Sequence, residues 1–156
     1  MLRFPYLEEP LIGPPPPSLP NTAQVRWRPL VPVVIHGSQS LVTFGRALID
    51  SGADDTLFPL DVANQLNIPL LPPTGHAIRW RGQRYQVTYG TAELELIDDD
   101  GNSLRWPAIV GFSPANLRYP LLGVCGFLGY FDLRLLGLGR LIELEPNASF
   151  PQIVQP

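Results

Sequence analysis

The chain has 156 residues, a formal net charge of −3 and a single cysteine, Cys125. The length fits one domain with its own core, and the slightly acidic balance gives no reason to expect a nucleic-acid partner. One cysteine excludes an internal disulfide and a cysteine-based metal cluster, and no apolar run approaches the roughly 20 residues of a membrane span.

Prolines are concentrated at the start of the chain, where Pro14 to Pro17 stand in a row. Such a run favours polyproline II and cannot pair inside a sheet. We therefore expect a Pro-rich flexible leader over residues 1–22, a folded domain over 23–146 and a C-terminal tail over 147–156. No secretory signal is evident in the leader, and we expect a cytoplasmic protein with no membrane partner.

The first two expected strands lead to a single aspartate. Residues 25–35 are strand-like, and the interruptions at Pro29 and Pro32 favour an edge or interface strand. Residues 41–49 form the next expected strand, and its apolar end delivers Asp50.

A short helix is expected after the loop that follows this aspartate. Asp61 is a suitable N-cap for a helix that extends to about Asn67. Val62, Ala63 and Leu66 would form its apolar face.

The rest of the chain has the pattern of short strands. Residues 77–80 and 85–88 flank Arg81-Gly82-Gln83, which is typical of a hairpin. Residues 91–97 alternate between apolar and acidic side chains, which predicts a half-buried strand. Further strands are expected at 104–110, 132–136 and 141–145. The pattern predicts a mostly β single-domain barrel or sandwich with one or two short helices.

One stretch, Arg46 to Pro59, carries most of the functional information. A buried apolar strand ends in Asp50, and an unpaired buried charge is costly unless it has a role. Catalysis by paired carboxylates is such a role. The simpler interpretation is an ordinary turn, because Asp, Ser and Gly are all favoured in turns.

The run apolar-Asp50-Ser51-Gly52-Ala53-Asp54 resembles the active-site loop of the retroviral-type aspartic proteases, the retropepsins. The similarity covers roughly residues 26–146. It implies a retropepsin-like acid protease barrel that is active as a homodimer, and it requires no metal or other cofactor.

The resemblance implies roles for the residues of this loop. Asp50 matches the catalytic aspartate, and Ser51 matches the hydroxyl residue that ties two such loops together. Gly52 matches the residue whose carbonyl faces the bound peptide. Ala53, Asp54 and Asp55 match positions that line the substrate cleft.

Other segments take their implied roles from the same resemblance. The hairpin tip, Arg81-Gly82-Gln83, corresponds to the flap over the substrate, and Tyr119 and Leu121 are expected to line side-chain pockets. With Leu121, Leu122 and Gly123 match an apolar-apolar-Gly strand behind the catalytic loop. Arg28 matches an arginine that reaches the partner subunit's Asp54, and a solvated charge beside a strand is the alternative interpretation.

Two features depart from the family pattern. Val124 stands where an arginine often follows the apolar-apolar-Gly run, and the hairpin tip has one glycine where retroviral flaps are glycine-rich. A larger, cationic tip would narrow the cleft or favour acidic or polar substrates.

A single Asp-Ser-Gly element implies two chains. Peptide hydrolysis by carboxylates needs one ionised and one protonated group close together, and neighbouring carboxylates share one proton. Asp54 and Asp55 are too close to Asp50 along the loop to face it across a peptide. We therefore expect a homodimeric aspartic endopeptidase that acts on peptide or protein substrates. The alternative is a non-catalytic peptide-binding or dimerisation module on the same fold, and a chain that dimerises only inside a larger assembly also stays open.

Overall fold

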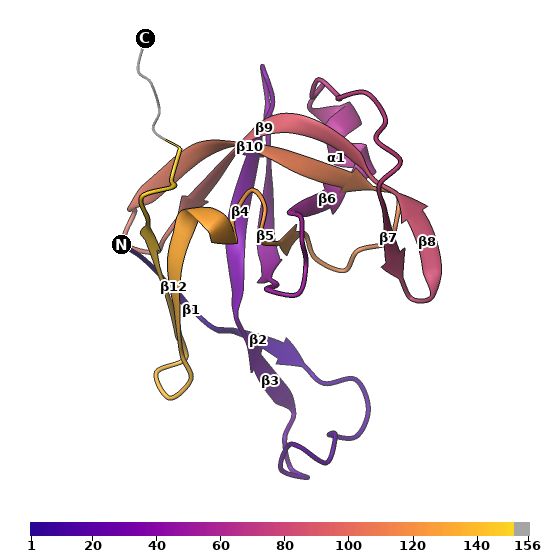
Figure 1. Ribbon diagram of the computed structural model, residues 1–156. Helices are drawn as coiled ribbons and strands as arrows, with labels where there is room; N and C mark the ends of the chain where they lie inside the picture. Colours follow the sequence, from indigo (N-terminus) through magenta and orange to yellow (C-terminus); the bar gives the residue numbers. More distant parts are fainter. Residues whose placement is uncertain (152–156) are drawn as a thin grey trace.

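Six strands close into a barrel in the computed structural model, which describes residues 1–151 (Figure 1). Around the barrel, the order of the strands is β10-β6-β11-β5-β4-β9. Their bounds are β4 Leu30–His36, β5 Leu41–Ile49, β6 Leu57–Pro59, β9 Thr88–Ile97, β10 Ser103–Ser113 and β11 Leu121–Leu122. The prediction of a mostly β chain is confirmed.

Three smaller sheets surround the barrel. One has three strands in the order β1-β13-β12, and two are ribbons, β2-β3 and β7-β8. The bounds are β1 Leu2–Pro5, β2 Leu7–Pro10, β3 Val25–Arg28, β7 Ala77–Trp80, β8 Gln83–Gln86, β12 Phe131–Leu136 and β13 Leu141–Pro146. Figure 1 shows the β2-β3 ribbon and the β7-β8 hairpin projecting from the barrel in different directions.

The longest pair of strands, β9 and β10, shows how the sequence pattern builds the core. Ala92, Leu94 and Leu96 of β9 are buried, as their alternation predicts. In β10, Trp106 is fully buried, and its indole Nε1 donates a hydrogen bond to the carbonyl of Gly126 at 2.9 Å. This buried polar group is therefore satisfied.

The expectation of an edge strand over residues 25–35 is wrong for its second half. β4 pairs with β5 on one side and with β9 on the other, so it is an interior strand. The pairing with β5 shifts register between Val31 and Val33, which places Pro32 at an irregularity where no ladder hydrogen bond is needed. Pro29 lies between β3 and β4 and ends the first strand.

The expected helix is present as α1, Leu60–Gln65, and a short 3₁₀ helix, η1, spans Leu128–Tyr130. Val62, Ala63 and Leu66 are buried as predicted. The predicted cap is wrong, because the chain passes directly from β6 into α1 and Pro59 takes the N-cap position. Asp61 lies in the first turn, where its charge still suits the positive end of the helix. No helix within residues 1–151 is long and apolar enough to cross a membrane.

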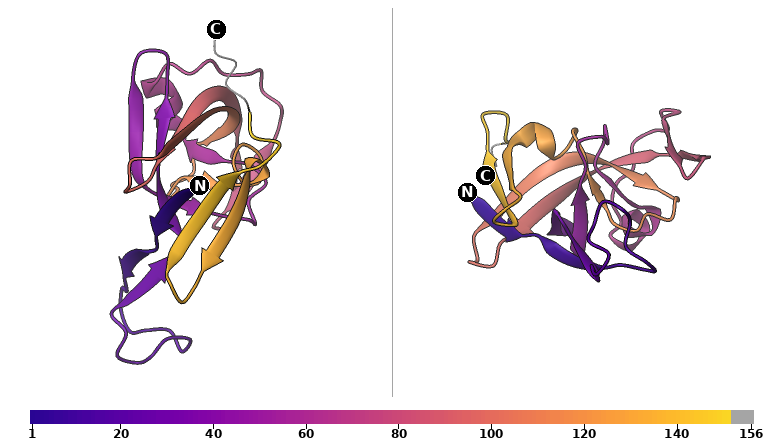
Figure 2. Two further views of the ribbon diagram at one scale, coloured as in Figure 1. Left: turned by 90° about the vertical axis from the view of Figure 1, so that its left-hand side faces the viewer. Right: turned by 90° about the horizontal axis from the view of Figure 1, so that it is seen from below.

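The first ten residues of the expected leader are structured. β1 pairs with β13, with Leu2 opposite Leu144, and β2 pairs with β3, with Glu9 opposite Arg26. Figure 2 shows the indigo N-terminal strand beside the yellow C-terminal strand. Leu2 and Phe4 are buried in the core, whereas the prolines fall at strand ends. The apolar alternation therefore prevails over the proline content, and the folded unit begins well before residue 23.

The expected C-terminal tail also packs in part. Phe150 contacts the rings of Trp106 and Phe131, at centroid distances of 5.9 and 5.4 Å. Residues 152–156 of this tail lie outside the described residues.

Candidate active site

Asp50 follows the end of β5, and the neighbouring strand β11 holds it in place. Leu121 and Leu122 of β11 run parallel to Leu48 and Ile49 of β5. The Leu48 N–H donates to the carbonyl of Pro120 at 2.8 Å, and the Asp50 N–H donates to the carbonyl of Leu122 at 3.1 Å. These backbone contacts fix the position of Asp50 relative to the barrel.

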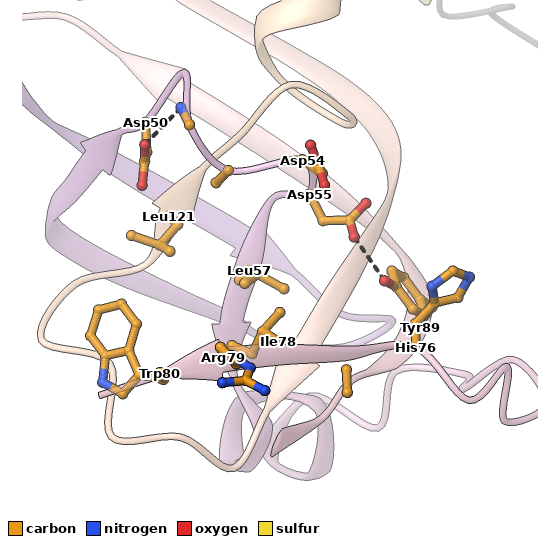
Figure 3. A pocket seen from close by; sticks show the side chains of 13 residues that line it. Asp50, Asp54, Asp55, Leu57, His76, Ile78, Arg79, Trp80, Tyr89 and Leu121 are labelled. Atoms are coloured by element: carbon orange, nitrogen blue, oxygen red, sulfur yellow. Dashed lines mark hydrogen bonds between the residues drawn. The ribbon is translucent and has the colours of Figure 1, made fainter. Parts of the chain in front are cut away.

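The carboxylate of Asp50 is oriented by its own loop. Its Oδ1 accepts a hydrogen bond from the Gly52 N–H at 2.9 Å, and the Ala53 N–H donates to the Asp50 carbonyl at 3.2 Å. Asp50 is half-buried and lines a cavity, whereas Ser51 is exposed and does not line it. The carboxylate of Asp50 therefore both closes the local turn and faces the cavity, as Figure 3 shows.

Thr56 connects this loop to the strand behind it. Its fully buried hydroxyl donates to the carbonyl of Cys125 at 2.9 Å and accepts from the Gly123 N–H at 3.2 Å. A Cβ on Gly123 would lie 2.7 Å from the Ala53 carbonyl oxygen, so only glycine fits there. The structure thus places Leu122 and Gly123 directly behind the loop. Thr56 was not identified from the sequence. Its one sequence signal is that it is a polar residue directly before the apolar strand β6.

A cavity of about 420 Å³ lies between this loop and β7 (Figure 3). It brings together six of the residues that the sequence proposed for the site, which are Asp50, Gly52, Ala53, Asp54, Asp55 and Leu121. Its other lining residues are Leu57, His76, Ala77, Ile78, Arg79, Trp80 and Tyr89. The size suits a short stretch of peptide with a few side chains.

The hairpin contributes to this cavity through its first strand. Arg81 and Gly82 have φ angles of 50° and 79°, the positive pair of a tight two-residue turn, and Trp80 pairs with Gln83 across it. The predicted hairpin is therefore present, with its second strand beginning two residues earlier than expected. Arg81, Gly82 and Gln83 are exposed and do not line the cavity; Trp80 does.

Tyr89 restrains one of the carboxylates. Its hydroxyl donates to Asp55 Oδ2 at 2.7 Å. Burial, together with the hydrogen bond and charge of Asp55, raises the pKa of Tyr89 to about 12, so the phenol stays a donor at any working pH. The sequence did not reveal Tyr89, because the partner is 34 residues away and no local pattern marks the pair.

A second cavity, of about 360 Å³, shares Trp80 and Leu121 with the first. Its other lining residues are Arg28, Leu48, Arg81, Arg118 and Tyr119. Two expected cleft residues, Arg81 and Tyr119, are therefore found here. The indole N–H of Trp80, at the boundary of the two cavities, is buried and has no hydrogen-bond acceptor within residues 1–151.

Glu9 organises the wall of this second cavity. It accepts hydrogen bonds from Arg26 Nε at 2.7 Å, Arg28 Nη1 at 3.2 Å and the Tyr119 hydroxyl at 2.6 Å, and it pairs with Arg118 Nη1 at 2.9 Å. Burial opposes ionisation of Glu9, but the hydrogen bonds from Tyr119, Arg26 and Arg28 outweigh it and lower its pKa to about 2.

This network changes the expectation for Arg28. Its guanidinium is paired within its own chain, so a contact with the partner subunit's Asp54 would compete with Glu9. The sequence missed Glu9 because its position lies in the expected leader.

Comparison with known proteins adds no family assignment. The chain matches no protein-family model, and a search of the curated proteins finds no similar sequence. The function is therefore inferred from the residues and the geometry of the two cavities.

Proposed function

We propose that the protein is a retropepsin-like aspartic endopeptidase that works as a homodimer. The observation that carries the proposal is the setting of Asp50: a carboxylate at the end of a barrel strand, oriented by the Gly52 N–H and open to a cavity of peptide size. A structural turn alone needs no such cavity.

The second carboxylate in this proposal comes from the Asp50 of another copy. Asp55 has one oxygen engaged by Tyr89, and Asp54 belongs to the same short loop. A twofold axis would bring identical loops together, because residues at such an interface meet their own counterparts. The pair then shares one proton, since the first ionisation opposes the second.

The chemistry uses the two Asp50 carboxyl groups as base and acid. The ionised one takes a proton from a water molecule, whose oxygen attacks the scissile carbonyl carbon. The protonated one donates to the carbonyl oxygen. The tetrahedral intermediate then collapses: one of its hydroxyl groups gives a proton to the carboxylate that is now ionised, the other carboxyl group protonates the departing nitrogen, and the C–N bond breaks to give the acid and the amine. No covalent enzyme intermediate forms.

The substrate would lie between the loop and β7. Ala53, Leu57, Ile78 and Leu121 supply apolar contacts, and Trp80 lines the cavity beside them. We therefore assign the covering role to β7 and its turn, with Trp80 as the residue that reaches the cavity.

The test is cleavage of a mixed peptide library between pH 3 and 8 by the wild type and by Asp50→Asn. We expect cuts by the wild type that follow a bell-shaped acidic pH profile and disappear in the variant. Asp61→Asn, which changes an exposed aspartate on α1, is the matched control and should cleave normally. Cleavage that persists in Asp50→Asn would refute the proposal.

A peptide-binding module without turnover is the second candidate. It is favoured by one observation, that each chain has a peptide-sized cavity but one Asp-Ser-Gly loop. Peptide binding by a confirmed dimer, without cleavage and unchanged by Asp50→Asn, would support this candidate.

A further inference from the structure

We propose that the second cavity is a subsite for an acidic side chain of the peptide, so that the enzyme selects substrates with Glu, and less strongly Asp, beside the scissile bond. This inference rests on the proposed function, because it concerns the same cleft. The inference concerns the kind of peptide that is cleaved, which the Asp50 loop does not determine.

The charge of the cavity carries the first step. Arg28, Arg81 and Arg118 line it, and Glu9 is the acidic residue that pairs with Arg28 and Arg118 within residues 1–151. Three guanidinium groups against one carboxylate leave an excess of positive charge. An acidic side chain would neutralise part of this excess, whereas a basic one would be repelled.

Two of the three arginines are held in place before any ligand arrives. Arg28 and Arg118 contact Glu9 and lie against the Tyr119 ring, 5.9 and 5.2 Å from its centroid. Each gives one Nη1 to Glu9, which leaves its other N–H groups free to bind a carboxylate. Because these side chains are already ordered, less conformational entropy is lost on binding.

The apolar part of the cavity selects the shape of the side chain. Leu48, Trp80 and Leu121 line it beside the arginines. Apolar surface next to a cationic wall suits a carboxylate on a methylene stem. Glu has one methylene more than Asp and reaches further, which is the reason for the expected order.

The two cavities belong to one cleft. Trp80 and Leu121 line both, so one peptide can place its scissile bond at Asp50 and a neighbouring side chain among the arginines. The cleft is then acidic at the catalytic loop and basic beyond Trp80.

The experiment measures peptide binding by Asp50→Asn, so that cleavage is not needed for the readout. The probes are fluorescent peptides, capped at both ends, from a mixed library in which one position at a time is fixed as Glu, Gln or Lys. At one position we expect Glu to bind about tenfold tighter than Gln, and Lys to bind more weakly than both. Added salt should reduce the preference.

Variants test whether the arginines of the second cavity cause the preference for Glu. Arg81→Gln, added to Asp50→Asn, should reduce the Glu-over-Gln preference at least about threefold without disturbing Glu9, and Arg118→Gln should act in the same direction. Arg134→Gln is the control, because Arg134 is exposed on β12 and lines neither cavity. Equal binding of Glu and Gln at every position would overturn the inference, as would a preference that survives both cavity variants.

Two further outcomes separate the alternatives. The first is tested with an uncapped peptide that has a free terminal carboxylate and no Glu. If this peptide binds as tightly as the capped Glu peptide, a chain end and not a side chain occupies the cavity, and the assignment is overturned. A Glu preference in binding by a protein that cleaves nothing would support the acidic subsite while refuting the proposed catalysis.

Discussion

At the residue scale, Gly123 marks the point where two backbone segments approach too closely for a side chain. In Gly123→Ala, the new Cβ would press on the carbonyl oxygens of Ala53 and Asp55. We expect a loss of about 1–3 kcal/mol in the free energy of unfolding, because such overpacking forces the backbone to shift. Urea unfolding measures this loss.

Gly45→Ala provides the matched comparison on β5. A Cβ there would meet no atom within 4 Å, so its effect should stay within about 0.5 kcal/mol. Equal losses in the two variants would show that the close approach behind the Asp50 loop is not what requires Gly123.

The residues of the candidate site differ in how far the sequence reveals them. Asp50 and Gly52 lie in one turn, and their types alone indicate the hydrogen bond that joins them. Thr56 and Tyr89 act through partners that the fold brings from 69 and 34 residues away. Such contacts leave no local pattern, so a single sequence does not predict them.

At the scale of elements, Glu9 ties the β2-β3 ribbon to the segment at Arg118 and Tyr119. Its pKa is lowered from 4.5 to about 2, which corresponds to about 3 kcal/mol of stability. Because the folded-state pKa is the lower one, this contribution is fully present above pH 4.5 and is lost as the pH falls toward 2. Unfolding by denaturant, measured from pH 2 to 7, should show this loss.

Glu9→Gln should remove this contribution at neutral pH and flatten the pH dependence between 4.5 and 2. Glu8→Gln is the control, because Glu8 is exposed on the same strand and should have little effect. An unchanged pH profile in Glu9→Gln would mean that the buried carboxylate does not stabilise the ribbon.

The elements themselves were largely predictable, and the exceptions involve proline. The alternation in β9 and the turn at Arg81-Gly82 are local signals, and the strand and the turn are both present nearly as expected. Proline content suggested an edge strand at β4 and a mobile leader over residues 1–22. The fold instead places Pro32 at a register shift and buries Leu2 and Phe4.

At the scale of the whole molecule, the proposed sharing of an Asp50 pair would make activity a property of two chains. Wild-type protein that exchanges subunits with about a ninefold excess of Asp50→Asn should retain about a tenth of its activity, because most wild-type chains then have an inactive partner. Specific activity should also rise with protein concentration in the range where sedimentation shows association. Activity that is unchanged by the added variant would indicate that each chain works alone.

The sheet β1-β13-β12 joins the two ends of the described chain, with Arg3 and Glu143 in contact across 140 residues. During synthesis, β1 leaves the ribosome long before its partner β13. The side chains of Leu2 and Phe4, which are buried in the finished fold, therefore stay exposed until β13 has been made. Closing so long a loop is slow, because its entropy is lost before the strand contacts form. A nascent chain stalled before Leu141 would leave both β1 and β12 without their partner and open to aggregation.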